Sequence, residues 1–283
     1  MHDIIIVGAG SAGCVLANRL SADPARRVCL IEAGPPDRNP FIHIPLGLAL
    51  LARSRSLNWG FATEPEPGLG NRRLYWPRGR VVGGSSSINA MIYMRGHPAD
   101  YAGWAEAAGP AWDWPVVRQI FLDLEGNTGI LDAHHGTTGP LAVSNLRQVN
   151  PLSRAFVAAG VECQHAGNPD FNGATQDGVG LYQVTQREGR RLSSARAFLD
   201  PVRHRANLTV LTGALVERVL FDGPRASGVR LRGRDLPLAP GGEVILCGGA
   251  INSPQLLLLS GIGPGADLQR LGLPVLHLSL IHI

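Results

Sequence analysis

The chain has 283 residues, a formal net charge of +4 and a pI of about 9.2, and 45% of its residues are hydrophobic. This is enough apolar material for one large domain or two smaller ones. All 26 basic residues are arginines, which excludes a Schiff-base lysine and the lysine of a phosphate-binding P-loop. The arginines are dispersed without an interleaved aromatic platform, so we expect no nucleic-acid partner.

The cysteines and the lengths of the apolar runs indicate the cellular compartment in which we expect the protein. Cys14, Cys29, Cys163 and Cys247 form no C-x-x-C pair and are typical of small buried hydrophobes in a reducing compartment. The first strand is expected to begin within three residues of Met1, which leaves no room for a signal peptide, and no apolar run reaches the length of a membrane span. We therefore expect a cytoplasmic protein without a transmembrane segment.

The first informative stretch runs from Asp3 to Gly13. The apolar residues 4–7 predict a buried parallel strand, and Gly8, Gly10 and Gly13 follow with the spacing G-x-G-x-x-G before a helical pattern. In a dinucleotide site the first glycine permits the tight turn and the second lets the backbone approach a pyrophosphate. The third lets helix and strand pack closely.

Glu32 ends a second apolar run, Val28–Ile31, close to the spacing expected for a carboxylate that binds a ribose. Such a carboxylate accepts hydrogen bonds from ribose hydroxyls and repels a 2′-phosphate. The alternative is a strand, turn and helix without a ligand and with a solvated glutamate, which this context disfavours.

Residues 35–78 are rich in proline and glycine and lack clear periodicity, which is typical of a lid or an excursion around a ligand. Within this stretch, Trp59 and Phe61 are predicted to be packing residues rather than cofactor contacts.

A second glycine-rich block extends from Gly79 to Gly96. Gly83 and Gly84 are followed by three serines, a composition that suits a nest of backbone N–H groups around an anionic or polar ligand. Asn89 adds an amide able to bind a heteroaromatic edge. The apolar residues that follow argue against a flexible linker.

Residues 98–191 read as helices followed by part of a second sheet. A helical pattern covers 98–125, with Trp104, Trp112 and Trp114 as core aromatics and Asp113 as an N-cap. Residues 151–160 form an amphipathic helical pattern, and 180–186 alternate as an antiparallel strand does. The pair His134-His135 lacks flanking ligands at metal-binding spacing, so no metal site is expected.

The pattern then returns to a strand-rich α/β type. A short helix is expected at 193–199, a meander of strands at 207–212, 215–221 and 228–231, and a buried strand at 243–247. A leucine-rich helix is expected from Pro254 to Ser260, with Ser253 as its N-cap.

Taken together, these blocks resemble the glucose–methanol–choline (GMC) oxidoreductases, a family of flavoproteins. The resemblance rests on the N-terminal glycine turn with Glu32, on the block Gly79–Gly96, and on Gly249–Gly263, and it extends to about Leu276. The amino-acid sequence of residues 91–96 is most similar to that of choline dehydrogenase and related alcohol dehydrogenases.

The resemblance implies that the ligand is FAD. It places the pyrophosphate and adenosine on the N-terminal turn and Glu32, the isoalloxazine along the second block, and the adenine against the backbone of Val216. The cofactor-binding residues implied in this way are Gly8, Gly10, Ser11, Ala12, Gly13, Glu32, Ala33, Val82, Gly84, Asn89, Ala90, Met91, Ile92 and Val216. Some members bind FAD covalently through a histidine where this chain has Ile88, so non-covalent FAD is expected.

The implied reaction is oxidation of a small primary alcohol, of the choline type or another, with hydride transfer to flavin N5 and an unspecified electron acceptor. The family's catalytic histidine lies near the far C-terminus, and this chain has about half the usual family length. We therefore expect an N-terminal portion with an atypical tail at 277–283 and name no catalytic residue; His97 is interpreted as structural or at the cofactor rim.

The expected fold is α/β, a Rossmann-like FAD-binding domain in two parts, 1–140 and 192–276, with part of an antiparallel-sheet substrate domain at 141–191. Three alternatives remain open for the function. These are a flavin-dependent hydroxynitrile lyase, a nicotinamide-dependent dehydrogenase, against which the second block argues, and a non-catalytic FAD-binding fragment.

Overall fold

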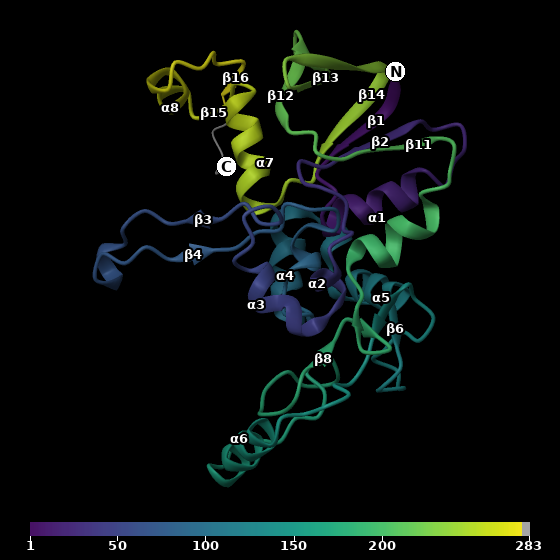
Figure 1. Ribbon diagram of the computed structural model, residues 1–283, viewed down its shortest axis with the longest axis vertical. Helices are drawn as coiled ribbons and strands as arrows, with labels where there is room; N and C mark the ends of the chain where they lie inside the picture. Colours follow the sequence, from purple (N-terminus) through teal and green to yellow (C-terminus); the bar gives the residue numbers. More distant parts are fainter. Residues whose placement is uncertain (279–283) are drawn as a thin grey trace. The chain divides into compact units, whose positions relative to one another are not determined.

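A computed structural model describes residues 1–278 of the chain, which divides into two compact units (Figure 1). The first unit comprises Met1–Ile42, Leu46–Ile88 and the chain from Ser193 onward, and the second comprises His43–Pro45 and Asn89–Leu192. The insert expected at 141–191 lies within the second unit. The assignment of cofactor and substrate domains to particular residues stays a prediction.

The first unit is built on a six-stranded sheet with the order β11-β2-β1-β14-β13-β12. The first four of these strands pair in parallel, and β13 pairs antiparallel with both β14 and β12. This mixed sheet confirms the expected α/β class. The strand bounds are β1 (His2–Val7), β2 (Val28–Ile31), β11 (Leu208–Leu211), β12 (Val216–Asp222), β13 (Arg225–Leu231) and β14 (Arg234–Leu246).

Two helices flank this sheet. Helix α1 (Ser11–Leu20) packs against β1 and β2, and α7 (Gly249–Leu259) packs against β12. The expected start of the second helix at Pro254 is wrong. The chain turns at Gly249, with φ +83°, directly after β14, so the helix begins there and Pro254 lies inside it. At its end, Ser260 Oγ accepts a hydrogen bond from Val219 N–H at 2.8 Å, which ties the helix to β12.

The rest of the first unit consists of short elements. An apolar cluster of Ile42, Leu51, Leu57, Val81 and Ile88 packs among them. The helices and strands are α2 (Pro40–His43, which ends in the second unit), α3 (Leu48–Leu51), β3 (Phe61–Ala62), β4 (Tyr75–Trp76), β15 (Ile262–Gly263), α8 (Gly265–Arg270) and β16 (His277–Leu278). A 3-10 turn spans Gly84–Ser87, and the helix expected at 193–199 is a π-helix at Ala195–Leu199.

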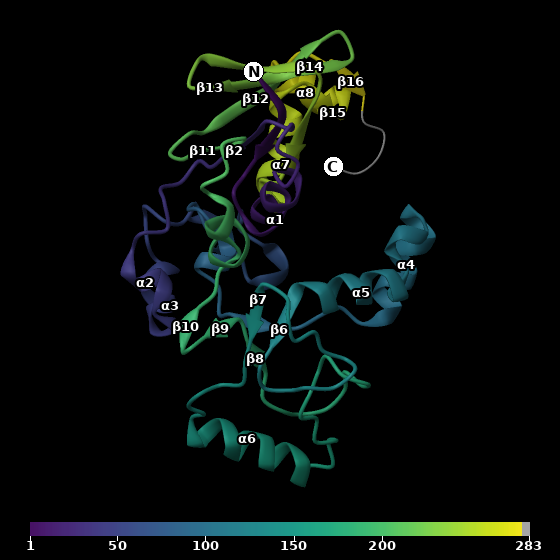
Figure 2. The ribbon, with the colours of Figure 1, turned by 90° about the vertical axis from the view of Figure 1, so that its right-hand side faces the viewer.

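The second unit combines three longer helices with short strand pairs (Figure 2). Asp113 caps α5 as expected, because its carboxylate accepts from Trp114 N–H at 2.8 Å. The strand expected at 180–186 is interrupted at Thr185. The element bounds are β5 (Ile92–Tyr93), α4 (Pro98–Ala108), α5 (Trp114–Leu124), β6 (Glu125–Asn127), β7 (Leu141–Val143), α6 (Pro151–Glu162), β8 (Gln183–Val184), β9 (Gln186–Arg187) and β10 (Arg190–Arg191).

Several large apolar residues are exposed in the second unit, among them two of the tryptophans expected in a core. Trp104 and Trp112 pack edge to face on each other but are 52% and 45% exposed, and Leu152 and Phe156 on α6 are 77% and 73% exposed. The spacing of apolar residues predicts that a helix has an apolar face, but it does not show whether another part of the protein covers that face.

In residues 1–278, none of the helices combines the length and the apolar composition of a membrane span.

A buried network of charged and polar side chains lies inside the second unit. The Arg95 guanidinium donates to Glu125 Oε2, and Glu125 Oε1 pairs with His135 Nδ1 at 2.9 Å and with Asn127 Nδ2 at 2.8 Å. His135 Nε2 lies 2.9 Å from Asp170 Oδ2. Both imidazole nitrogens therefore face carboxylates, an arrangement that favours the imidazole with a proton on each nitrogen.

The protonation of His135 follows from this geometry. Burial lowers the pKa of its imidazole, but the hydrogen bonds and charges of Glu125 and Asp170 outweigh burial and raise the pKa overall. A raised pKa in the folded state gives stability that is complete below the unfolded pKa of about 6.5 and is lost as the pH rises through the folded value.

We predict that His135→Gln lowers the free energy of unfolding by about 3 kcal/mol near pH 6, because it leaves buried carboxylates without their partner. The difference from the unsubstituted chain should shrink as the pH rises above the raised pKa. Denaturant unfolding measured across this pH range tests the prediction, with His134→Gln as control, since no hydrogen bond joins the His134 ring to Glu125 or Asp170. A difference that does not change with pH would contradict it.

Candidate functional site

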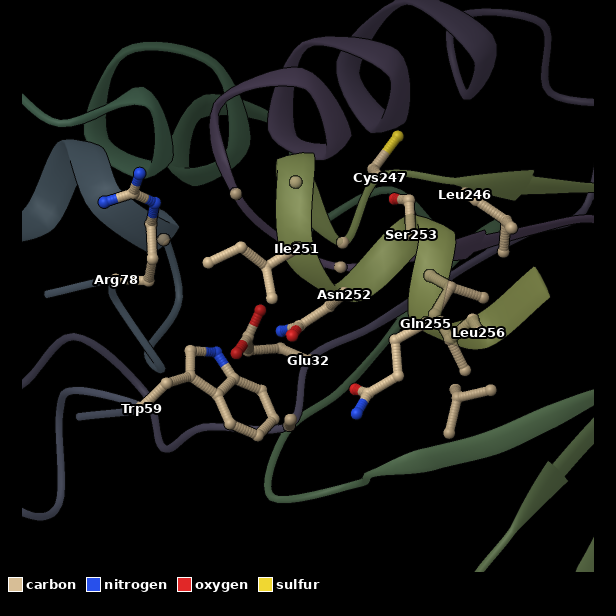
Figure 3. Close-up of a pocket in the computed structure, with 18 of the residues that line it drawn as sticks. Glu32, Trp59, Arg78, Leu246, Cys247, Ile251, Asn252, Ser253, Gln255 and Leu256 are labelled. Carbon is tan, nitrogen blue, oxygen red and sulfur yellow. The ribbon is translucent and has the colours of Figure 1, made fainter. Parts of the chain in front are cut away.

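A pocket of about 970 Å³ opens in the first unit at the carboxyl ends of its parallel strands (Figure 3). Val7, Ile31 and Leu246, the last residues of β1, β2 and β14, all line it. Ligands of open α/β sheets bind at this edge. The stretches that contribute, which are distant in the sequence, are the first glycine turn and residues 31–33, 59 and 61, 78–79, 84–85, 214–217 and 246–256.

The three glycines of the first turn have different physical roles. A Cβ on Gly8, where φ is +105°, would lie 2.5 Å from Cys247 O, and one on Gly13 would lie 1.9 Å from Gly8 O. The fold itself therefore requires glycine at these two positions. A Cβ on Gly10 would meet no atom closer than 3.9 Å, so it would project into the open space of the pocket that this residue lines.

The second glycine block packs directly on this turn. Gly83 N–H donates to Ala9 O at 2.7 Å, and a Cβ on Gly84, where φ is +56°, would lie only 2.7 Å from Gly10 Cα. A side chain at position 84 would therefore collide with the turn, so this approach requires glycine there. The block and the turn, more than 60 residues apart in the sequence, therefore form one continuous wall.

Glu32 is held where the turn meets the following loop. Its side chain is buried, Oε2 accepts from Ala9 N–H at 3.0 Å, and Oε1 accepts from Gly34 N–H at 2.8 Å. Burial raises the pKa of the Glu32 carboxyl, while these hydrogen bonds and the charge of Arg80 act in the opposite direction. Each carboxylate oxygen keeps a second lone pair for a ligand hydroxyl.

Two helices begin at the pocket. Gly10 and Gly248, the N-caps of α1 and α7, provide no side-chain cap for the N–H groups of the first turn. Ser11 and Ala12 of α1 and the residues from Gly249 to Ser253 of α7 line the pocket. Free N–H groups and the positive ends of two helix dipoles favour an anionic group at this place.

Asn252 on the first turn of α7 points into the pocket toward Glu32 and Trp59 (Figure 3). Its Oδ1 atom is buried and has no hydrogen-bond partner among residues 1–278. A buried acceptor without a partner is costly, so the pocket fits a ligand that carries N–H or O–H donors as well as negative charge.

The cofactor-binding residues predicted from the sequence separate into three groups. Those that line the pocket are Gly8, Gly10, Ser11, Ala12, Glu32, Ala33, Gly84 and Val216. Gly13 packs beneath the turn, and Val82 is fully buried without lining the pocket. Those that lie in the second unit are Asn89, Ala90, Met91 and Ile92.

Within the second unit the amide of Asn89 is engaged locally. Its Oδ1 accepts from Met91 N–H at 3.1 Å and from Arg191 Nη1 at 2.9 Å. Burial lowers the pKa of Arg191 to about 10. His97 caps α4, since its Nδ1 accepts from Ala99 N–H at 3.2 Å, which agrees with the structural interpretation of this residue.

Sequence reasoning missed several lining residues. Trp59 and Phe61 were expected to pack, and they do stack on each other, but both also line the pocket. Asn252 stands in the third motif without having been assigned a role. Gly249 is the residue of the sequence from which the role of Asn252 could have been predicted. A helix that begins at Gly249, directly after the strand, places Asn252 on its first turn at the pocket.

Comparison with known proteins assigns the whole described fold to one family. The family model described as GMC oxidoreductase matches residues 2–277. An alcohol dehydrogenase (acceptor) from Pseudomonas putida is 54% identical over 98% of this chain and 51% of its own length. The mitochondrial choline dehydrogenase of Homo sapiens is 46% identical over 97% of this chain and 48% of its own length. The chain thus spans about half the length of these relatives.

Solved structures give the same result for the fold. Pyridoxine 4-oxidase from Mesorbium loti superposes with a TM-score of 0.92 at 39% identity, over 98% of this chain and 55% of its own. An FAD-dependent oxidoreductase from Chaetomium thermophilum gives 0.88 at 31% identity, over 97% and 50%. The open space at Gly10, the uncapped helix starts and the donor-seeking Asn252 fit the FAD of such proteins. The chain belongs to the GMC oxidoreductase family.

Proposed function

We propose that this chain binds FAD non-covalently and provides the cofactor site of an enzyme that oxidises a small primary alcohol. The observation that carries the proposal is the meeting of Gly10, Gly84 and Glu32 in one pocket at the carboxyl edge of the sheet. When bound, FAD supplies the hydride acceptor, N5 of its flavin.

The residues of the pocket are assigned roles by their chemistry. The pyrophosphate belongs at Gly10, where the missing Cβ allows close approach and α1 and α7 direct N–H groups at negative charge. Glu32 accepts the ribose hydroxyls. The backbone at Val216, at the start of β12, is assigned to the adenine edge. The chain has no lysine, so we assign the balance of the pyrophosphate charge to these backbone dipoles and to the side chain of Arg78, which lines the pocket.

Non-covalent binding is supported by the side chain at position 88. Ile88 is 5% exposed and packs with Leu51, Leu57 and Val81 in an apolar cluster. A saturated hydrocarbon side chain has no nucleophilic atom, so this position cannot form the bond that a histidine forms in some family members.

The substrate and the reaction rest on the relatives. The names of two of them, an alcohol dehydrogenase and a choline dehydrogenase, support an alcohol as the hydride donor. Because this chain spans about half of their length, we propose that the proton-accepting base lies in the part of the relatives that it does not cover. A flavin-dependent lyase is the second candidate, and a nicotinamide-dependent dehydrogenase is disfavoured by the block Gly79–Gly96, which resembles a motif of the flavoprotein family.

Flavin release and alcohol-dependent reduction test the proposal together. We expect acid precipitation of FAD-loaded protein to leave the flavin in the supernatant. Primary alcohols should bleach the oxidised flavin anaerobically when the chain is extended to the length of its relatives, but not with the 283-residue chain alone. Flavin retained in the pellet would contradict non-covalent binding. An extended, FAD-loaded protein that releases cyanide from hydroxynitriles and is not bleached by alcohols would identify a lyase.

Substitutions at Gly10 and Gly13 distinguish an effect on folding from an effect on cofactor binding. We predict that Gly10→Ala changes the free energy of unfolding by at most about 1 kcal/mol, the cost of alanine at an N-cap. The same substitution should weaken FAD binding at least about tenfold, because its methyl group occupies the pyrophosphate position.

Gly13→Ala is the matched control. Its Cβ would lie 1.9 Å from Gly8 O, so we expect it to destabilise the fold by about 3 kcal/mol. Thermal melting and FAD titration of both variants provide the measurement. A Gly10→Ala protein that binds FAD as tightly as the unsubstituted chain would contradict the placement of the pyrophosphate.

A further inference from the structure

We propose that Trp59 and Phe61 form an aromatic wall on which the adenine of the cofactor stacks. This inference rests on the proposed function, because it assigns a partner to one end of FAD. Both rings line the pocket, their centroids are 5.8 Å apart, and their planes are parallel within 4°. The parallel pair is an offset stack, and the ring surface that it turns to the pocket can pack against a flat nucleobase.

The wall is held rigidly by Asn58. Its amide is buried, with Oδ1 accepting from the N–H groups of Gly60 and Arg78 at 2.9 and 3.0 Å, and Nδ2 donating to Ala52 O at 2.8 Å. Trp59 N–H itself donates to Arg78 O at 2.9 Å. An indole mounted on such a fixed backbone loses little conformational freedom when a ligand binds.

Two observations place the wall at the Glu32 end of the pocket. The indole of Trp59 and the carboxylate of Glu32 both line the pocket and are directed toward one another in it (Figure 3). Arg80 also connects the two residues: its guanidinium carbon lies 5.4 Å from the centroid of the Trp59 ring, and its charge lowers the pKa of Glu32. The guanidinium covers the ring from one side.

The position of Glu32 decides which end of FAD meets the wall. The ribose assigned to Glu32 carries the adenine, whereas the isoalloxazine lies beyond the pyrophosphate at Gly10 and Gly84. A flat group bonded to the ribose at Glu32 is therefore the group within reach of Trp59. The residues Ala214–Glu217, which also line the pocket, provide polar backbone groups for the edge of the same base.

Binding of FAD and of ADP, which carries the adenine, ribose and pyrophosphate without the flavin, tests the proposal. Trp59→Leu removes the ring, and we expect it to weaken both ligands by the same factor, roughly tenfold, as for other bases stacked on aromatic side chains. Trp59→Phe keeps a ring and should recover most of the affinity. Trp112→Leu, in an exposed tryptophan of the second unit that does not line the pocket, is the control and should change neither affinity.

Calorimetric titration separates the outcomes. A loss of FAD affinity without a loss of ADP affinity would place Trp59 at the flavin end and overturn the proposal, as would unchanged affinity for both ligands. If the unsubstituted chain binds neither ligand, the proposed function itself fails. If Trp59→Leu does not fold, Trp59→Phe is compared with the unsubstituted chain by the quenching of tryptophan fluorescence on ADP binding. We expect most of the quenching to disappear in Trp59→Phe. Full retention of the quenching would contradict the stacking of adenine on Trp59.

Discussion

The first unit depends on the close approach of two backbones at Gly10 and Gly84. The hydrogen bond from Gly83 N–H to Ala9 O fixes the second block on the first turn, and neither Gly8 nor Gly84 leaves room for a Cβ. This contact joins segments that the sequence separates widely. Without it, the pocket at the ends of β1, β2 and β14 would lose the lining that Gly84 and Ser85 provide.

The electrostatics of the pocket follow from the same backbone. The chain contains no lysine, and the positive groups at the pocket are the N–H groups at the starts of α1 and α7 and the side chain of Arg78, which lines it. Glu32 contributes the opposite charge, and its two backbone hydrogen bonds hold it beside the turn. In the proposed complex the N–H groups would bind the diphosphate and Glu32 would accept hydrogen bonds from the ribose hydroxyls.

The parts of the fold with a strong local signal were predictable from the sequence. The strand, glycine turn and helix at 2–20, the strand ending at Glu32 and the Asp113 cap each depend on neighbouring residues, and the structure contains all of them. The convergence of the second block on the turn followed from the family resemblance rather than from local pattern.

The failures have physical causes as well. Helix α7 starts at Gly249, because the end of β14 fixes its position and the internal Pro254 is tolerated. Trp59 and Asn252 reach the pocket through tertiary placement, which no periodicity encodes. Amphipathic spacing likewise identified α6 but gave no information on whether Leu152 and Phe156 are covered, and both are exposed.

The central claim is that distant segments of the first unit share one dinucleotide ligand. Hydrogen–deuterium exchange of the chain with and without FAD tests it most directly, because amides that contact or close around a ligand gain protection. The account predicts simultaneous protection of residues 8–13, 32–34, 83–85 and 249–253. Protection confined to one of these segments, or found only elsewhere in the chain, would contradict it.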